Sequence, residues 1–191
     1  MKMRLRLFFL PLAAIVFSCL LAGQARAGKV ADGTVGFTGF LVGKETCTLV
    51  SSDLNVDFGT LSVVSVEPPA ILASRDVAFQ FTKCPTTTNR IKMTVDFNET
   101  QASSLTYGIV NSGDAGVMGI LACNAGQSVQ SGVFGCTTGA RQLRNGAHLI
   151  GIVGDDRTLS FPLTVSLTPL GWGLSVFGSI NMTVNFTFEE M

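Results

Sequence analysis

The sequence predicts an all-β protein folded as a single antiparallel sandwich. Glycine, threonine, serine, valine and phenylalanine are abundant, and only 14% of the residues are charged; β-branched and aromatic residues favour strands. Several segments alternate apolar with polar residues, the period of a strand with one buried face, and no long segment has apolar residues at helical spacing. Turn residues separate these segments at short intervals, which is typical of a sandwich.

The chain opens with the pattern of a secretory signal peptide. A basic start precedes an apolar run from Leu7 to Ala22, and Gln24–Ala27 supplies a small-x-small ending. The run contains Pro11 and is shorter than the roughly 20 residues of a spanning helix, which favours cleavage after residue 27 over a retained anchor. The exported domain then carries nine basic and thirteen acidic residues, so nucleic acid is not an expected partner.

The first predicted strand runs from Ala31 to Leu41, and glycines interrupt its apolar face. Glycine weakens a strand, so we expect this segment to lie in a groove that supports it. The groove can belong to another molecule, or the segment can be an ordinary first strand of its own sheet. The alternating residues of this face are Ala31, Gly33, Val35, Phe37 and Gly39.

Alternation and turn residues place further strands along the chain. Pro162 lies in a strand predicted from Arg157 to Leu167 and indicates an edge or a bulge. The glycine-rich stretch from Thr168 to Gly178 is predicted to be a long exposed loop that contains Trp172. The other strands are expected at Phe40–Val50, Leu54–Phe58, Asp76–Thr82, Ile91–Phe97, Leu105–Val110 and Val117–Cys123.

The last predicted strand has the most regular alternation in the chain. Polar residues occupy every second position, and Glu189 and Glu190 follow as an expected solvated tail. The strand is expected to be a core strand in any sandwich. Its apolar residues are Ile180, Met182, Val184, Phe186 and Phe188.

Four cysteines remain once Cys19 leaves with the signal peptide. An even number in an exported domain indicates disulfides. Four cysteines allow three pairings, and the residues alone do not choose among them, although their order suggests sequential pairs. A zinc site needs closely spaced cysteines or several histidines, which the sequence lacks. The four are Cys47, Cys84, Cys123 and Cys136.

Together these features resemble the pilin subunits of bacterial chaperone–usher fimbriae, the type 1-like family. The segment Gly33–Gly39 is similar to the N-terminal extension of that family, and Cys47 and Cys84 are similar in spacing to its disulfide. Gly178 stands fourteenth from the end of the sequence, where these pilins carry a glycine, and the last strand matches their final β-zipper strand. The chain departs from the family at Glu190, where an aromatic residue is usual, and in its second cysteine pair.

The resemblance implies an incomplete immunoglobulin-like sandwich that lacks its seventh strand. Residues 1–27 are then the signal peptide, 28–39 a donor-strand extension and 40–191 the pilin domain. It implies a Cys47–Cys84 disulfide, with Cys123 and Cys136 available to staple a loop. The expected donor residues are Ala31, Gly33, Val35 and Phe37, and the expected groove residues are Gly178, Ile180, Met182, Val184, Phe186 and Phe188.

The same resemblance implies a function in assembly. A periplasmic pilus chaperone would fill the groove first, and at an outer-membrane usher the extension of a neighbouring subunit would replace it. Because donor and groove belong to different copies, the contact is head-to-tail and propagates into a filament. The protein would be exported through the periplasm and would form a fimbria on the bacterial surface that supports cell adhesion.

Two other functions suit an exported sandwich. A self-contained carbohydrate-binding module would use Trp172 as its platform. A secreted enzyme would need a nucleophile with a base in reach, but the exported domain has a single histidine, His148, in a loop-like stretch. The adjacent Asp155 and Asp156 are typical of a turn. We therefore expect no catalytic, cofactor or metal site.

Overall fold

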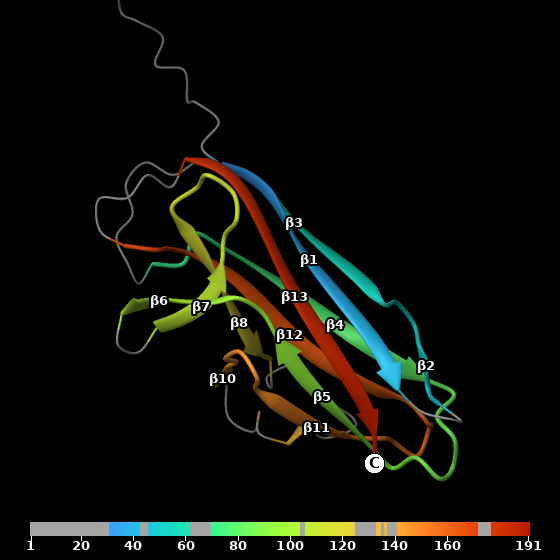
Figure 1. Ribbon diagram of the computed structural model, residues 1–191. Coiled ribbons are helices and arrows are strands. Elements are labelled where there is room, and N and C mark those ends of the chain that lie inside the picture. Colours follow the sequence, from blue (N-terminus) through green and yellow to red (C-terminus); the bar gives the residue numbers. More distant parts are fainter. Residues whose placement is uncertain are drawn as a thin grey trace, which may run out of the picture.

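The computed structural model describes residues 31–42, 46–61, 70–103, 106–124, 133–134, 136, 141–171 and 177–191. Within these ranges the chain forms strands arranged in two sheets, which confirms the predicted all-β sandwich (Figure 1). The same ranges contain no helix long and apolar enough to cross a membrane. The predicted signal peptide lies outside the described residues.

The first sheet has six strands in the order β3-β1-β13-β5-β11-β9. In Figure 1 the long strands β1 and β13 lie side by side and their arrows point the same way. The strands of this sheet are β1 (Ala31–Val42), β3 (Asp53–Leu61), β5 (Arg90–Asp96), β9 (Val133–Phe134), β11 (His148–Ile152) and β13 (Gly178–Glu190).

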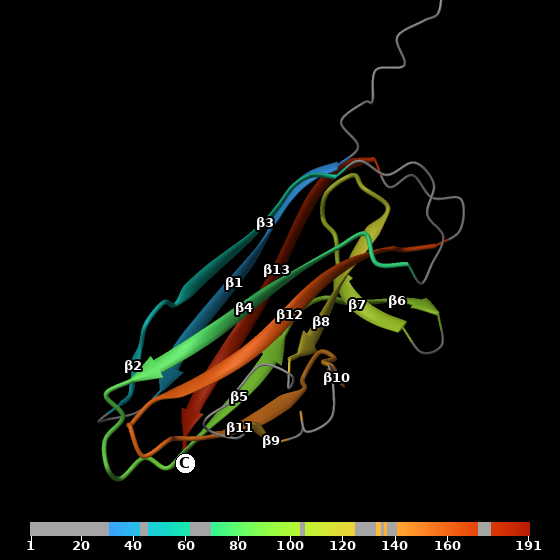
Figure 2. The ribbon, with the colours of Figure 1, turned by 180° about the vertical axis from the view of Figure 1, so that it is seen from behind.

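The second sheet packs against the first, faces the viewer in Figure 2 and has the order β2-β4-β12-β8-β7-β6, with β10 paired to β8. Its centre is formed by two long antiparallel pairings of β12, one with β4 and one with β8. The strands are β2 (Thr48–Leu49), β4 (Ala73–Thr82), β6 (Glu99–Ser103), β7 (Thr106–Val110), β8 (Val117–Cys123), β10 (Arg141–Gln142) and β12 (Leu159–Pro169).

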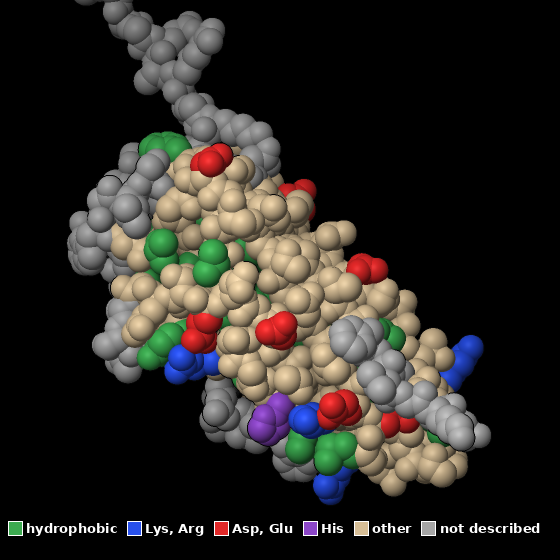
Figure 3. Space-filling view, viewed as in Figure 1, with side chains coloured by type: hydrophobic (Ala, Val, Ile, Leu, Met, Phe, Trp, Pro, Cys, Tyr) green, Lys and Arg blue, Asp and Glu red, His purple; other side chains and the backbone are tan. Residues whose placement is uncertain are grey.

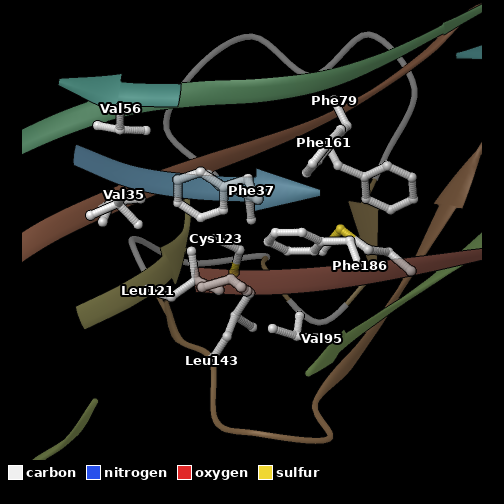
Figure 4. Packing of buried hydrophobic residues seen from close by; sticks show 14 of the residues in the cluster. Val35, Phe37, Val56, Phe79, Val95, Leu121, Cys123, Leu143, Phe161 and Phe186 are labelled. Atoms are coloured by element: carbon white, nitrogen blue, oxygen red, sulfur yellow. The ribbon is translucent and has the colours of Figure 1, made fainter. Parts of the chain in front are cut away.

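The core lies between the two sheets and is built from the alternating residues that the sequence singles out. Phenylalanine rings from both sheets meet there: Phe79 packs on Phe186 and Phe188 with ring centroids 4.8 and 5.1 Å apart. Figure 4 shows this cluster with Val35 and Phe37 of β1 inside it. Burial of each such side chain stabilises a fold by about 1.5–3 kcal/mol. The alternating apolar residues of the sequence therefore contribute directly to the stability of the fold.

Most predicted strands are confirmed, but the one expected at Phe40–Val50 is wrong. Its first residues extend β1 to Val42, and β2 contains only Thr48 and Leu49. The boundary expected between residues 39 and 40 therefore falls inside a strand. The sequence does carry a sign of the break, because the polar stretch Gly43-Lys44-Glu45-Thr46 separates the apolar residues on its two sides.

Pro162 does not mark an edge, since β12 lies between β4 and β8. The carbonyl of Pro162 accepts a hydrogen bond from the Asn124 amide at 3.0 Å, one residue beyond the end of β8. In an antiparallel strand the N–H and C=O of one residue point to the same neighbour. The side of Pro162 that lacks an N–H therefore points beyond the end of β8. No hydrogen bond of the regular β12–β8 pairing is lost there.

The loop expected at Thr168–Gly178 begins later than predicted. Thr168 is buried and lies in β12, which continues to Pro169, while Gly178 is already the first residue of β13. Residues 172–176, including Trp172, lie outside the described residues. The two disulfides join Cys47 to Cys84 and Cys123 to Cys136, which confirms both expected pairs.

Candidate functional site

The candidate site is the strand position between β3 and β13, which we call the slot. It is occupied by β1 of the same chain. All twelve residues of β1 pair with β13 in parallel, from Ala31 opposite Gly178 to Val42 opposite Glu189. On its other side β1 pairs antiparallel with β3. Every other pairing among the described strands is antiparallel, so β1 is an inserted strand.

The slot is therefore closed within one chain. The sequence leaves two alternatives open for Ala31–Leu41: a groove of another molecule or a place in its own sheet. In the structure the segment pairs within its own sheet. It is not an ordinary first strand, however, because it lies in the interior of the sheet and not at an edge. An expectation of an open groove in the single chain is wrong for this structure, since a segment of the right pattern lies within reach and fills it.

The inward side chains of β1 fill the centre of the slot. Val35 and Phe37 are 0% and 1% exposed. The ring of Phe37 lies 5.6 Å from that of Phe186, and Val35 stands opposite Met182 on β13 and Val56 on β3. The burial of these two side chains is the one that the alternation of apolar residues predicts. For Ala31 the structure gives only the backbone pairing with Gly178.

Glycines at both ends of this apolar pair let β1 approach its neighbours closely. A Cβ at Gly33 would overlap the carbonyl oxygen and the Cβ of Ile180. A Cβ at Gly39 would lie 2.7 Å from the ring of Phe188 and 3.1 Å from that of Phe79. Gly36, between them on the outward face, has no neighbour nearer than 3.8 Å. The slot is narrow at its two ends, and the buried side chains of Val35 and Phe37 occupy the part between them.

The wall that β13 contributes is the strand expected from the sequence. Its five apolar side chains are all buried, with at most 3% exposed. Gly178 begins the strand with φ +127°, and a Cβ there would lie 2.8 Å from the Ala115 amide nitrogen. The loop 111–116 passes here, and the Asn111 side chain accepts the Asn181 N–H at 2.7 Å. Glycine at 178 is required because this loop lies against the start of β13.

The sequence predicts that Glu190 lies in a solvated tail, and this prediction is wrong. Its carboxylate accepts hydrogen bonds from the Cys47 amide at 2.6 Å and from the Thr88 hydroxyl at 2.7 Å. Arg157 in turn donates to the carbonyls of Thr88 and Cys84. The end of β13 is thereby fixed to the Cys47–Cys84 disulfide, just after the connection from β1. Glu189 does behave as expected: it is exposed and pairs with Lys92 at 2.9 Å.

An ion pair lies at the start of β6, the strand that ends the order of the second sheet. Arg144 donates to both carboxylate oxygens of Glu99, at 3.2 and 2.7 Å, and lies 3.6 Å from the ring centroid of Tyr107. The hydrogen bond from Arg144 lowers the pKa of Glu99 below its ordinary value and raises that of Arg144. The cluster ties the β6–β7 hairpin to the turn that precedes β11.

The residues weighed for catalysis are not brought together. His148 is exposed at the start of β11, and Asp155 and Asp156 lie in a turn, as expected. In the described ranges no three His, Cys, Asp or Glu side chains gather as a group that could hold a metal ion. The comparisons with known proteins add no further guidance: no family and no curated protein matches the chain.

The close approach at Gly33 predicts a sharp difference between two glycines of one strand. Gly33→Ala should destabilise the fold by about 1–3 kcal/mol or more, because the added methyl overlaps the backbone of β13. Gly36→Ala should be neutral or stabilising by up to about 1 kcal/mol, because its Cβ has room and the unfolded chain loses entropy. Denaturant unfolding of both variants measures this; equal effects would contradict the narrow end of the slot.

The contacts of Glu190 predict that the two terminal glutamates differ in importance. Glu190→Ala leaves the Cys47 amide and the buried Thr88 hydroxyl without their acceptor and should cost about 1.5–3 kcal/mol. Glu189→Ala is the matched control and should cost less than about 1 kcal/mol, because its pair with Lys92 is exposed. Chemical denaturation compares the two, and a loss at Glu189 as large as at Glu190 would contradict the assignment.

Proposed function

We propose that this chain is a structural subunit of a surface fimbria, which polymerises by donor-strand exchange after chaperone-assisted folding and supports cell adhesion. The observation that carries the proposal is the position of β1, inserted between β3 and β13 with Val35 and Phe37 fully buried. Only residues 43–46 join β1 to Cys47, where the rest of the fold is fixed by a disulfide. Such a strand can be exchanged as a unit between identical copies.

Removal of β1 would leave a fold that cannot remain soluble by itself. Val56 and Phe186 would lose the side chains that cover them, and β3 and β13 would each present an unpaired edge beside an apolar groove. Edges and patches of this kind aggregate. Burial of Val35 and Phe37 alone is worth about 3–6 kcal/mol, comparable with the whole stability of many domains. Some strand must therefore always occupy the slot.

This requirement supports the partners that the family resemblance suggests. A periplasmic chaperone would hold the slot with a strand of its own, and a neighbouring subunit would replace that strand at the usher. Backbone hydrogen bonds along β3 and β13 supply affinity, while the pockets of Val35 and Phe37 supply specificity. The fold that this proposal implies is an immunoglobulin-like sandwich whose seventh strand is supplied from outside and whose filament lies on the bacterial surface.

The closed chain is then the resting form of a subunit without partners. A strand tethered by a short connection has a high effective concentration at its own slot. The chain consequently competes with its neighbours for the same site. A chaperone that occupies the slot before β1 does would keep the subunit available for assembly.

The free edge of the first sheet is poorly suited to adding a further strand. The pairing between β1 and β3 shifts register between Gly33 and Thr34. On β3, Gly59 has φ +61°, and its amide N–H donates a hydrogen bond to the Asp57 side chain at 2.7 Å. This is a β-bulge, which twists an edge away from regular pairing. Exposed Asp53 and Asp57 add like charges along the same strand. The slot, and not the outer edge of β3, is the favoured place for exchange.

Deletion of residues 31–42 tests the proposal. The shortened chain should aggregate when it refolds alone, because the slot stays empty. A synthetic peptide of residues 28–42 added during refolding should restore a soluble protein with a cooperative thermal transition.

The control is the same peptide with Val35→Asp and Phe37→Asp, which should not restore the fold, since both charges would be buried. A soluble, cooperatively folded monomer of the shortened chain without any peptide would refute the proposal.

A further inference from the structure

We infer that the loop 111–116 covers a second strand edge of β13 and prevents two copies of the chain from pairing there. This edge lies on the β5 side of β13, across the strand from the slot. The inference therefore goes beyond the proposed function and does not depend on it. The partner that the edge fits is the same edge of a second copy.

The β5 side of β13 is paired over only part of its length. β5 pairs with residues 185–190, and among the described strands none pairs with residues 178–184 on that side. The loop 111–116, between β7 and β8, lies there in place of a strand (Figure 1). The Ser112 amide donates to the Asn181 carbonyl at 2.9 Å. A neighbouring strand would bind the same carbonyl.

The side chain of Asn111 takes the place of one peptide unit of the missing strand. Its Oδ1 accepts the N–H groups of Asn181 and Gly113 at 2.7 and 3.0 Å. Its Nδ2 donates to the carbonyls of Ala115 and Ser179 at 2.8 and 3.2 Å. These bonds use the whole hydrogen-bonding capacity of the amide. Asn111 therefore holds the loop together and also covers the backbone of β13.

The rest of the loop fits closely against the same edge. A Cβ at Gly113 would overlap the Ser179 carbonyl oxygen, and the Ala115 amide donates to that oxygen at 3.1 Å. The Ser179 hydroxyl accepts the Asp114 N–H at 3.1 Å and donates to the Asp114 carboxylate at 3.2 Å. The exposed carboxylate adds a charge beside the edge, which is a common protection against pairing between sheets.

The strand that the loop covers has the composition of a self-pairing segment. From Ile180 to Phe188 it contains no charged residue, proline or glycine, and β-branched and aromatic residues recur. Segments of this kind pair with each other when an edge becomes accessible. Figure 3 shows the face of this sheet dominated by uncharged side chains. The strand itself thus offers no charge that would repel a second copy.

Two copies of this edge are complementary to each other. The backbone groups of Ser179, Asn181 and Thr183 point to the same side, because alternate residues of a strand face the same neighbour. In an antiparallel pair centred on Asn181, Ser179 of one copy lies opposite Thr183 of the other. All three side chains are exposed, short and uncharged. The pair is symmetric, so each copy presents the same surface to the other.

Self-association of a full-length chain with a locked slot tests the inference. Thr38 of β1 lies opposite Asn185 of β13, and both are exposed. A disulfide between Thr38→Cys and Asn185→Cys therefore keeps β1 in the slot and excludes strand exchange. In this locked chain, Asn111→Ala removes every bond of the side-chain amide. Asn111→Asp removes only the two donations and keeps the acceptor, so it preserves the fold if the alanine variant does not fold.

We expect the locked parent to remain monomeric in analytical ultracentrifugation. Both Asn111 variants should self-associate with a dissociation constant lower by about tenfold or more, because several backbone hydrogen bonds become available to a second copy. Asn181→Lys added to these variants should abolish the association, because two like charges would lie opposite each other. Thr187→Lys should leave the association unchanged, because β5 covers that part of β13.

Asn145→Ala is the matched control for a lost amide side chain. Asn145 accepts the Phe97 N–H at 3.1 Å in the turn before β11, and its removal should leave the locked chain monomeric. Association of this control as strong as that of Asn111→Ala would overturn the inference, since it would reflect a general loss of stability.

Three further results would overturn the inference. One is a folded Asn111 variant that stays monomeric, and another is an association that Asn181→Lys does not weaken. The third is an Asn111→Asp chain that does not fold, because the loop would then be needed for folding itself. None of these results bears on the proposed function, since β1 is locked in the slot of every variant.

Discussion

The fold depends on one constraint: the position between β3 and β13 cannot stay empty. The side chains that face it, among them Val56 and Phe186, belong to the same core as the phenylalanine cluster of the second sheet. A vacancy there would remove cover from the core and break two backbone ladders at once. For that reason the proposed function rests on which strand occupies the slot.

A second constraint, the anchoring of Cys47, sets the direction in which β1 lies in the slot. The disulfide to Cys84 and the hydrogen bond to Glu190 hold the residue that follows β1 at one end of β13. Glu190 replaces the aromatic residue usual in the resembled family, and it interacts with Thr88 and Cys47 through hydrogen bonds. The same contacts that stabilise the end of the sheet thus restrict how a tethered β1 can lie.

The sequence predicts those elements whose residues alternate, and it fails where structure depends on distant partners. The buried faces of β5, β12 and β13 follow from period-two alternation, and both disulfides follow the order of the cysteines. The two-residue strands β9 and β10 are too short for any period. The role of Glu190 depends on an amide 143 positions away, and the pairing of β1 with β13 joins two distant parts of the chain, which no local pattern records.

The weakness of β1 as a strand has a physical purpose in this setting. Its three glycines at 33, 36 and 39 lower its intrinsic preference for extended structure, and between Gly33 and Gly39 the large buried side chains are those of Val35 and Phe37. A strand with a continuous apolar face would bind the slot more tightly and leave it more slowly, since affinity differences lie mostly in dissociation. Backbone pairing along both sides holds β1 in place, while the glycines on its inward face weaken its grip on the slot, as the proposed exchange requires. A donor that must leave one seat to occupy another needs this balance.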